Sequence, residues 1–187
     1  MGLFTKKDMS PAQTVVQEVL KAKKGERALI IANPETNVMA QELYTAFIEQ
    51  GVRPTLMFQP RKNSLDYAEE AVVGAIKSEP EMILSISAGK LGKDREAMEH
   101  PYSLETDGKS QNYDNSFDYL LSGKKSIRAV WTPGLSEDMF ARTVNIDYRQ
   151  LSDRCKAISK LLTELPASAS PRRAERTSPW GSRGARR

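Results

Sequence analysis

Short apolar runs alternate along the chain with longer stretches in which apolar side chains recur every three or four residues. The runs are rich in Ile, Val and Leu and are flanked by turn residues, a pattern typical of buried β-strands. The longer stretches have the period of helices that bury one face. Four strands are expected on this basis, at 28–32, 54–58, 82–87 and 126–131.

The segments between these strands predict how the strands pair. A helix is expected within 36–51, ended by Gly51, and a second within 64–78, with Ser64 as N-cap and Leu65 on its buried side. Helices placed between strands indicate right-handed crossovers and parallel pairing. The sequence therefore predicts an α/β fold: an open, mainly parallel Rossmann-like sheet of about four strands with helices on both faces. This domain is expected over 12–164, after a flexible N-terminus at 1–11.

Two more helices are expected after the fourth strand. The first has Ser136 as N-cap, and the second carries an apolar stripe at helical spacing, which places Cys155 in the core and not at a reactive site. The stripe consists of Tyr148, Leu151, Cys155, Ile158 and Leu162. Between the third and fourth strands, residues 99–116 predict a long polar loop, either functional or mobile.

Ligands of open parallel sheets usually bind beyond the carboxyl ends of the strands. Four segments follow the predicted strands at this edge: 33–37, 59–63, 87–93 and 132–136. Within them, the polar side chains of Asn33, Glu35, Thr36 and Ser87 are the candidates to line a pocket.

Motifs for catalysis are not found. Residues 87–94 (SAGKLGKD) mix Gly and Lys after a strand, but the spacing differs from that of a P-loop and Asp94 would repel phosphate, so we interpret them as a solvated helix start. No Gly-x-Gly-x-x-Gly follows the first strand. With one cysteine and one histidine, His100, neither a disulfide framework nor a Cys/His zinc cluster can form. We assign no catalytic residue, no metal ligand and no cofactor to this chain.

The positive charge is concentrated in the tail. Residues 165–187 contain six arginines and one glutamate, whereas the rest of the chain is nearly neutral. An arginine-rich tail could bind nucleic-acid phosphates, but no basic face on the body matches it, so nucleic acid is not the expected partner. No apolar run has the length of a membrane span, and the start of the chain lacks the apolar core of a signal peptide. We expect a cytoplasmic protein that does not enter a membrane.

Three stretches resemble the N-terminal half of metal-dependent aminopeptidases of the aminopeptidase T (thermophilic leucyl aminopeptidase) type. The third stretch is the most specific, because its Pro-Gly turn, Phe-x-Arg-Thr-Val step and Ile-Asp-Tyr-x-x-Leu helix entry occur together at the expected spacing. The stretches are KKGERALIIANPE at 23–35, AFIEQGVRPTLMFQPR at 46–61 and IRAVWTPGLSEDMFARTVNIDYRQL at 127–151. The resemblance covers roughly 12–164.

This resemblance implies an N-terminal, non-metal-binding domain of a hydrolase that removes N-terminal amino acids from peptides. In that family two divalent metal ions (Zn or Co) are held by Glu, His and Asp ligands of a C-terminal domain, so no ligand transfers to this chain and we expect it to be inactive alone. The family's N-terminal domain shapes substrate access and dimer contacts, which makes a homodimer possible. Two alternatives stay open: a related ring-cleaving dioxygenase, which shares the architecture, and a stand-alone small-molecule-binding domain.

The resemblance also predicts a short strand and a Gly-Thr-Asp motif soon after Leu162, where the arginine-rich tail stands instead. Read one base back, the codons for 174–187 can spell Gly-Thr-Asp-Val-Thr-Val-Gly-Ile, and the fixed codon of Trp180 makes the glycine after it obligatory. We therefore expect that a frameshift within 164–169 truncates the domain, and that 165–187 are a disordered tail translated out of frame.

Overall fold

The computed structural model describes residues 9–106, 108–144 and 146–164. The chain divides into two compact units, Met1–Ile146 and Asp147–Arg187. The predicted tail at 165–187 lies outside the described residues, as does most of the predicted N-terminal segment; a helix already begins at Pro11.

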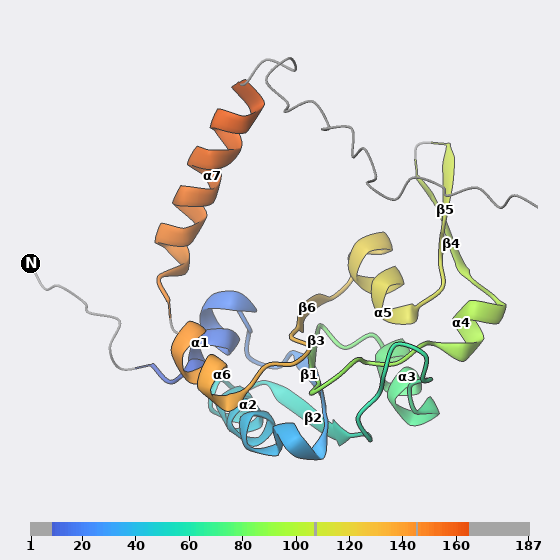
Figure 1. Cartoon of the computed structure of the whole chain (residues 1–187), viewed down its shortest axis with the longest axis horizontal. Coiled ribbons are helices and arrows are strands. Elements are labelled where there is room, and N and C mark those ends of the chain that lie inside the picture. Colours follow the sequence, from blue (N-terminus) through green and yellow to red (C-terminus); the bar gives the residue numbers. More distant parts are fainter. Residues whose placement is uncertain (1–8, 107, 145, 165–187) are drawn as a thin grey trace, which may run out of the picture. The chain divides into compact units, whose positions relative to one another are not determined.

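The first unit is built on four parallel strands in the order β2-β1-β3-β6 (Figure 1). The predicted α/β fold with an open, parallel Rossmann-like sheet is confirmed. The strands are β1 (Arg27–Ala32), β2 (Arg53–Phe58), β3 (Met82–Ile86) and β6 (Arg128–Trp131). Because the chain passes from β1 to β2 on one side and then to β3 on the other, the strand order reverses between β1 and β3.

Strand β1 lies at the centre and is buried on both faces. Ala28, Ile30 and Ala32 face one hydrophobic cluster, and Leu29 and Ile31 face the other. A strand that no longer meets water on either side needs no polar alternation, which is why its sequence is a continuous apolar run.

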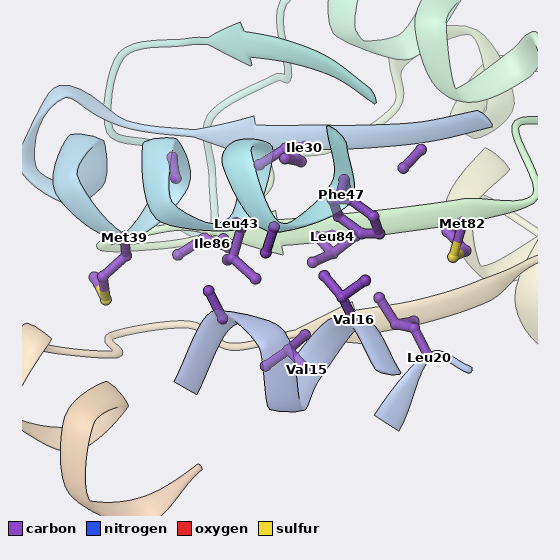
Figure 2. Close-up of a cluster of buried hydrophobic side chains, with 14 of the residues drawn as sticks. Val15, Val16, Leu20, Ile30, Met39, Leu43, Phe47, Met82, Leu84 and Ile86 are labelled. Carbon is purple, nitrogen blue, oxygen red and sulfur yellow. The ribbon is translucent and has the colours of Figure 1, made fainter. Parts of the chain in front are cut away.

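One face of the sheet is covered by α2 (Asn37–Glu49), by α6 (Glu137–Thr143) and by an N-terminal helix formed by α1 (Pro11–Thr14) and the π-helical turn η1 (Val15–Val19). Figure 2 shows Val16 reaching from the N-terminal helix toward Phe47 of α2 and Leu84 of β3. Helix α2 follows the three-residue 3-10 turn η2 (Pro34–Thr36), which the sequence pattern does not predict. As predicted, it ends before Gly51, which has a φ of +76°.

The opposite face is covered by α3 (Glu70–Lys77), α5 (Ser116–Asp118) and the π-helical turn η3 (Tyr119–Gly123). The prediction that the helix now seen as α3 begins at Ser64 is wrong, because α3 begins at Glu70. Leu65, predicted to lie on the buried side of that helix, is 79% exposed. The backbone of 62–68 pairs instead with the loop after β3: Lys90 N–H donates to the Lys62 carbonyl at 2.9 Å, and Lys93 N–H donates to the Asp66 carbonyl at 2.9 Å. These backbone bonds occupy groups that a helix start would need.

The long connection after β3 is ordered. It contains α4 (Arg95–Glu99) and an antiparallel hairpin of β4 (Tyr102–Thr106) and β5 (Lys109–Tyr113), where the sequence predicts only a polar loop. The Tyr102 ring of the hairpin stacks on the Tyr119 ring of η3, with centroids 4.7 Å apart, so the hairpin packs against η3. Asp94 begins α4 as expected, but it is buried and not solvated: its carboxylate accepts from the Ala97 and Ser116 N–H groups.

Two ion pairs join the amino ends of the strands. The Arg128 guanidinium donates to Glu26 at 2.6 Å and to the Leu20 carbonyl at 2.8 Å. Burial opposes ionisation of Glu26, but the hydrogen bonds from Arg128 and the Lys23 N–H outweigh it and lower the pKa of that carboxyl. Beside this pair, hydrogen bonds from Arg27 lower the pKa of Glu81 to about 2. The carboxyl groups of Glu26 and Glu81 are therefore both ionised in the folded protein near neutral pH.

Replacing Arg128 tests whether this edge holds the sheet together. Arg128→Met removes the bonds to Glu26 and to two backbone carbonyls, and we expect it to lower the free energy of unfolding by about 1.5 kcal/mol. The matched control is Arg142→Met, because Arg142 pairs with Asp138 on the exposed side of α6, where such a pair contributes less than about 0.5 kcal/mol. Urea denaturation measures the free energy of unfolding of both variants. Equal losses would contradict the conclusion that the Arg128 bonds hold the amino ends of the strands together.

The described part of the second unit contains α7 (Tyr148–Glu164). The predicted helix is confirmed, but within the described part of this unit nothing covers its apolar stripe: Leu151, Ile158 and Leu162 are exposed, and so is Cys155. The prediction that Cys155 lies in the core is therefore wrong, because the described part of this unit offers no second element for the stripe to pack on. Within the described ranges, no helix has both the length and the apolar character needed to cross a bilayer.

Candidate functional site

The point where the strand order reverses is the expected place for a ligand in an open α/β sheet. Asn33 follows β1 at this point and Ser87 follows β3. Thr36 lies in the 3-10 turn after β1, and its side chain, like those of Asn33 and Ser87, is buried; Glu35 in the same turn is exposed. The structure thus brings Asn33, Thr36 and Ser87 to the predicted edge but withdraws them from solvent.

The Asn33 side chain bridges the ends of three strands. Its amide nitrogen donates to the Gln59 carbonyl, just after β2, at 2.8 Å. Its amide oxygen accepts from the Ala88 N–H, just after β3, at 2.8 Å. Because Asn33 itself directly follows β1, one fully buried amide joins the loops after β1, β2 and β3.

Neighbouring side chains complete this closure. The Thr36 hydroxyl lies 2.8 Å from the Ile86 carbonyl and 3.1 Å from that of Asn33, and the Asn33 N–H donates to it at 3.0 Å. Ser87 and Ser85 share a hydrogen bond of 3.1 Å. Buried Gln59 donates to the Leu91 carbonyl at 2.8 Å. The polar groups at the reversal point are therefore occupied by the protein itself.

An open cleft lies instead at the carboxyl ends of β3 and β6. Its volume is about 480 Å³, and its walls are formed by the loops after β2 and β3, by the segment of α5 and η3, and by the last residue of β6. We call it the Trp131 cleft; it is lined by Asn63, Ser64, Lys90–Lys93, Asn115, Phe117, Asp118, Leu121 and Trp131. Two of the four segments expected at this edge, 59–63 and 87–93, thus contribute to it.

Two close backbone approaches explain the positions of the glycines in SAGKLGKD. A Cβ at Gly89 would lie 2.4 Å from the Lys62 carbonyl oxygen, and a Cβ at Gly92 would lie 2.5 Å from the Ala68 nitrogen. Gly92 also has a φ of +100°, which other residues rarely adopt. The glycines let the loop after β3 lie directly against 62–68, and this contact forms one wall of the cleft.

The cleft combines an aromatic surface with positive charge. Trp131 is 53% exposed, and the Lys90 ammonium lies 5.5 Å from the centroid of its indole ring. Lys93 stands three residues further along the same loop. Asp94, which the sequence suggests would repel phosphate, is buried in the cap of α4 and is not part of the lining.

A second cleft, of about 760 Å³, lies between α3 and α4 and is acidic. Two of its carboxylates are engaged: Glu69 accepts from Lys62 at 2.5 Å, and Glu96 accepts from Lys77, which raises the pKa of that lysine. In the part of the chain that the structure describes, no group of three or more His, Cys, Asp or Glu side chains could hold a metal ion.

Comparison with known proteins adds no identification: no protein-family model matches this chain, and neither does any curated protein.

Sequence patterns find part of the cleft and miss the rest. Lys90 and Lys93 fall in a segment that the Gly-Lys pattern marks, and Trp131 ends a predicted strand. The wall formed by Asn115 and Phe117 has no comparable signal, because it depends on how the hairpin returns the chain to the sheet.

Asn33 and Glu35, both candidates from the sequence, should respond oppositely to truncation. Asn33→Ala leaves the Gln59 carbonyl and the Ala88 N–H buried without their partner, and we expect a loss of about 3 kcal/mol in the free energy of unfolding. Glu35→Ala alters an exposed side chain, so its effect should stay within about 0.5 kcal/mol. Chemical denaturation compares the two. A neutral Asn33→Ala would show that the buried amide does not hold the strand ends.

Proposed function

We propose that this chain is the non-metal-binding α/β domain of a metallo-aminopeptidase of the aminopeptidase T type, an enzyme that removes N-terminal amino acids from peptides. The parent enzyme would hold two divalent ions, Zn or Co, in a separate catalytic domain. In this proposal the chain contributes to the structure of the enzyme and does not itself hydrolyse peptides. Its proposed setting is the cytoplasm, where the single cysteine stays reduced.

The observation that carries the proposal is the Glu26–Arg128 ion pair. Glu26 belongs to the Gly-Glu-Arg lead-in of the first resembling stretch, and Arg128 belongs to the third. The two residues are 102 positions apart in sequence, yet their side chains meet at 2.6 Å. The resembling stretches thus contain residues that contact each other in space, which is compatible with the proposal that the stretches belong to one domain.

The same stretches provide other structural parts of the unit. The first supplies β1 and Asn33, the second supplies β2 and Gln59, and Asn33 joins them through its bond to the Gln59 carbonyl. The third supplies β6 and α6, whose Ser136 cap accepts from the Met139 N–H at 3.2 Å. Resemblance concentrated in strands, caps and ties supports a scaffold role.

The exposed stripe of α7 also supports a domain that works with further protein. Leu151, Ile158 and Leu162 lie on one side of this helix at coiled-coil-like spacing, and each is exposed. Covering such a stripe is favourable by about 25 cal/mol per Å² of apolar surface. The catalytic domain of the parent enzyme, or a second copy in a homodimer, would provide the cover.

The small-molecule-binding alternative is favoured by one observation, the Trp131 cleft. A cleft at the carboxyl ends of parallel strands with aromatic and cationic walls has the character of a ligand site. This function would be compatible with the scaffold role, since the two use different surfaces of the unit. No described residue favours the dioxygenase alternative or nucleic-acid binding.

Hydrolysis of amino-acid p-nitroanilides tests the proposal. The chain as it stands, supplied with Co²⁺ or Zn²⁺, should release no p-nitroaniline above the metal-only control. A version of the gene with its frame restored within 164–169 should encode Glu, His and Asp ligands further on and should give turnover that a chelator abolishes. Turnover by the present chain, or a restored frame without metal ligands, would contradict the proposal.

A further inference from the structure

We infer that the Trp131 cleft binds a small aromatic anion: a flat ring lies on the indole of Trp131, and the anionic group lies between the ammonium groups of Lys90 and Lys93. The inference does not depend on the aminopeptidase proposal, because it uses residues of the first unit alone and no step of hydrolysis.

The indole of Trp131 is the platform for the ring. Trp131 ends the edge strand β6, about half of it is exposed, and it lines the cleft. The Lys90 ammonium, 5.5 Å from the ring centroid, is the group described over it. A cation over an exposed ring is held only weakly, so an entering ring can replace it at small cost. Phe117 and Leu91 provide further apolar surface beside the indole.

The two lysines supply charge for which the described part of the chain shows no ion-pair partner. Some other lysines of this unit are paired, as Lys62 is with Glu69 at 2.5 Å and Lys124 is with Glu79 at 2.6 Å. Among the described residues, no carboxylate lies within ion-pair distance of Lys90 or Lys93. An anionic ligand would satisfy both ammonium groups.

The acid in the lining does not cancel this charge. Asp118 is the one carboxylate among the residues that line the cleft, and it accepts a hydrogen bond from the Ser122 hydroxyl at 2.7 Å. Two ammonium groups against one engaged carboxylate leave the cleft positive. Charged walls of one sign concentrate small ions of the opposite sign.

Directional donors flank the charge. The Asn115 amide oxygen accepts from the Phe117 N–H at 2.9 Å, which leaves the amide nitrogen as the group turned to a ligand's acceptors. Asn63 and Ser64 stand on the wall formed by 62–68. This wall is preformed, since Lys90 and Lys93 donate their backbone N–H groups to it at 2.9 Å. A preformed wall lowers the entropic cost of binding.

The volume sets the size of the ligand. At about 480 Å³ the cleft falls within the range of small-molecule sites. One or two fused rings with a single anionic group fit this space. An aromatic carboxylate and a nucleoside monophosphate share this chemistry, and the probes below separate the two sources.

Intrinsic fluorescence of Trp131 provides a direct test. The chain has one other tryptophan, Trp180, and Trp180→Phe makes Trp131 the only indole that reports. We would titrate this variant with benzoate and with adenosine 5′-monophosphate, using cyclohexanecarboxylate, adenosine and inorganic phosphate as matched partial ligands. Benzoate, the nucleotide or both should change the emission saturably, and whichever binds identifies the source of the anion.

Charge variants decide whether the lysines take part. Lys90→Ala and Lys93→Ala, each in the Trp180→Phe background, should raise the Kd by about tenfold. Lys156→Ala on α7 removes the same charge from a site outside the cleft and should leave the Kd unchanged. Circular dichroism confirms that each variant is folded.

Three results would overturn the inference. The first is that neither benzoate nor adenosine 5′-monophosphate changes the Trp131 emission saturably. The second is binding of cyclohexanecarboxylate or phosphate as tight as that of the aromatic probes, since the ring would then contribute nothing. The third is a Kd that Lys90→Ala and Lys93→Ala leave unchanged.

Discussion

The buried amide of Asn33 is the constraint on which the other features of the sheet's functional edge depend. Its two hydrogen bonds, both 2.8 Å, bind the loop after β2 and the loop after β3 to the end of β1. A buried amide that lost either partner would leave a polar group without compensation, so the three loops keep one arrangement. That arrangement fills the point where ligands of open parallel sheets usually bind.

Because the protein's own side chains fill the reversal point, the open cleft lies beside it, at the carboxyl ends of β3 and β6. The loop after β3, held at one end by Asn33, crosses 62–68 at Gly89 and Gly92 and presents Lys90 and Lys93 beside Trp131. The proposed scaffold role and the proposed ligand site can coexist because they use different residues. Glu26 and Arg128 hold the amino ends of the strands, whereas the Trp131 cleft opens at the carboxyl ends.

Much of the sheet follows from local sequence, and much of the site does not. Apolar runs predict all four strands, and the longest run is in β1, which is buried on both faces and so needs no polar alternation. Residues 64–69 resemble a helix start, but backbone pairing with the loop after β3 overrides that preference. The hairpin is missed although Asp107-Gly108 is a turn signal. Asn33 is placed at the correct edge, yet its burial depends on Gln59 and Ala88, which only the fold brings near.

Amide chemical-shift mapping tests the central claim, that the reversal point is closed and the Trp131 cleft is the open site. With ¹⁵N-labelled protein and saturating benzoate or adenosine 5′-monophosphate, the account predicts shift changes clustered at Lys90–Lys93, at Asn115–Leu121 and at the indole N–H of Trp131. The amides of Asn33–Thr36 should stay unchanged. Shift changes centred on Asn33–Thr36, with none at Trp131, would contradict it.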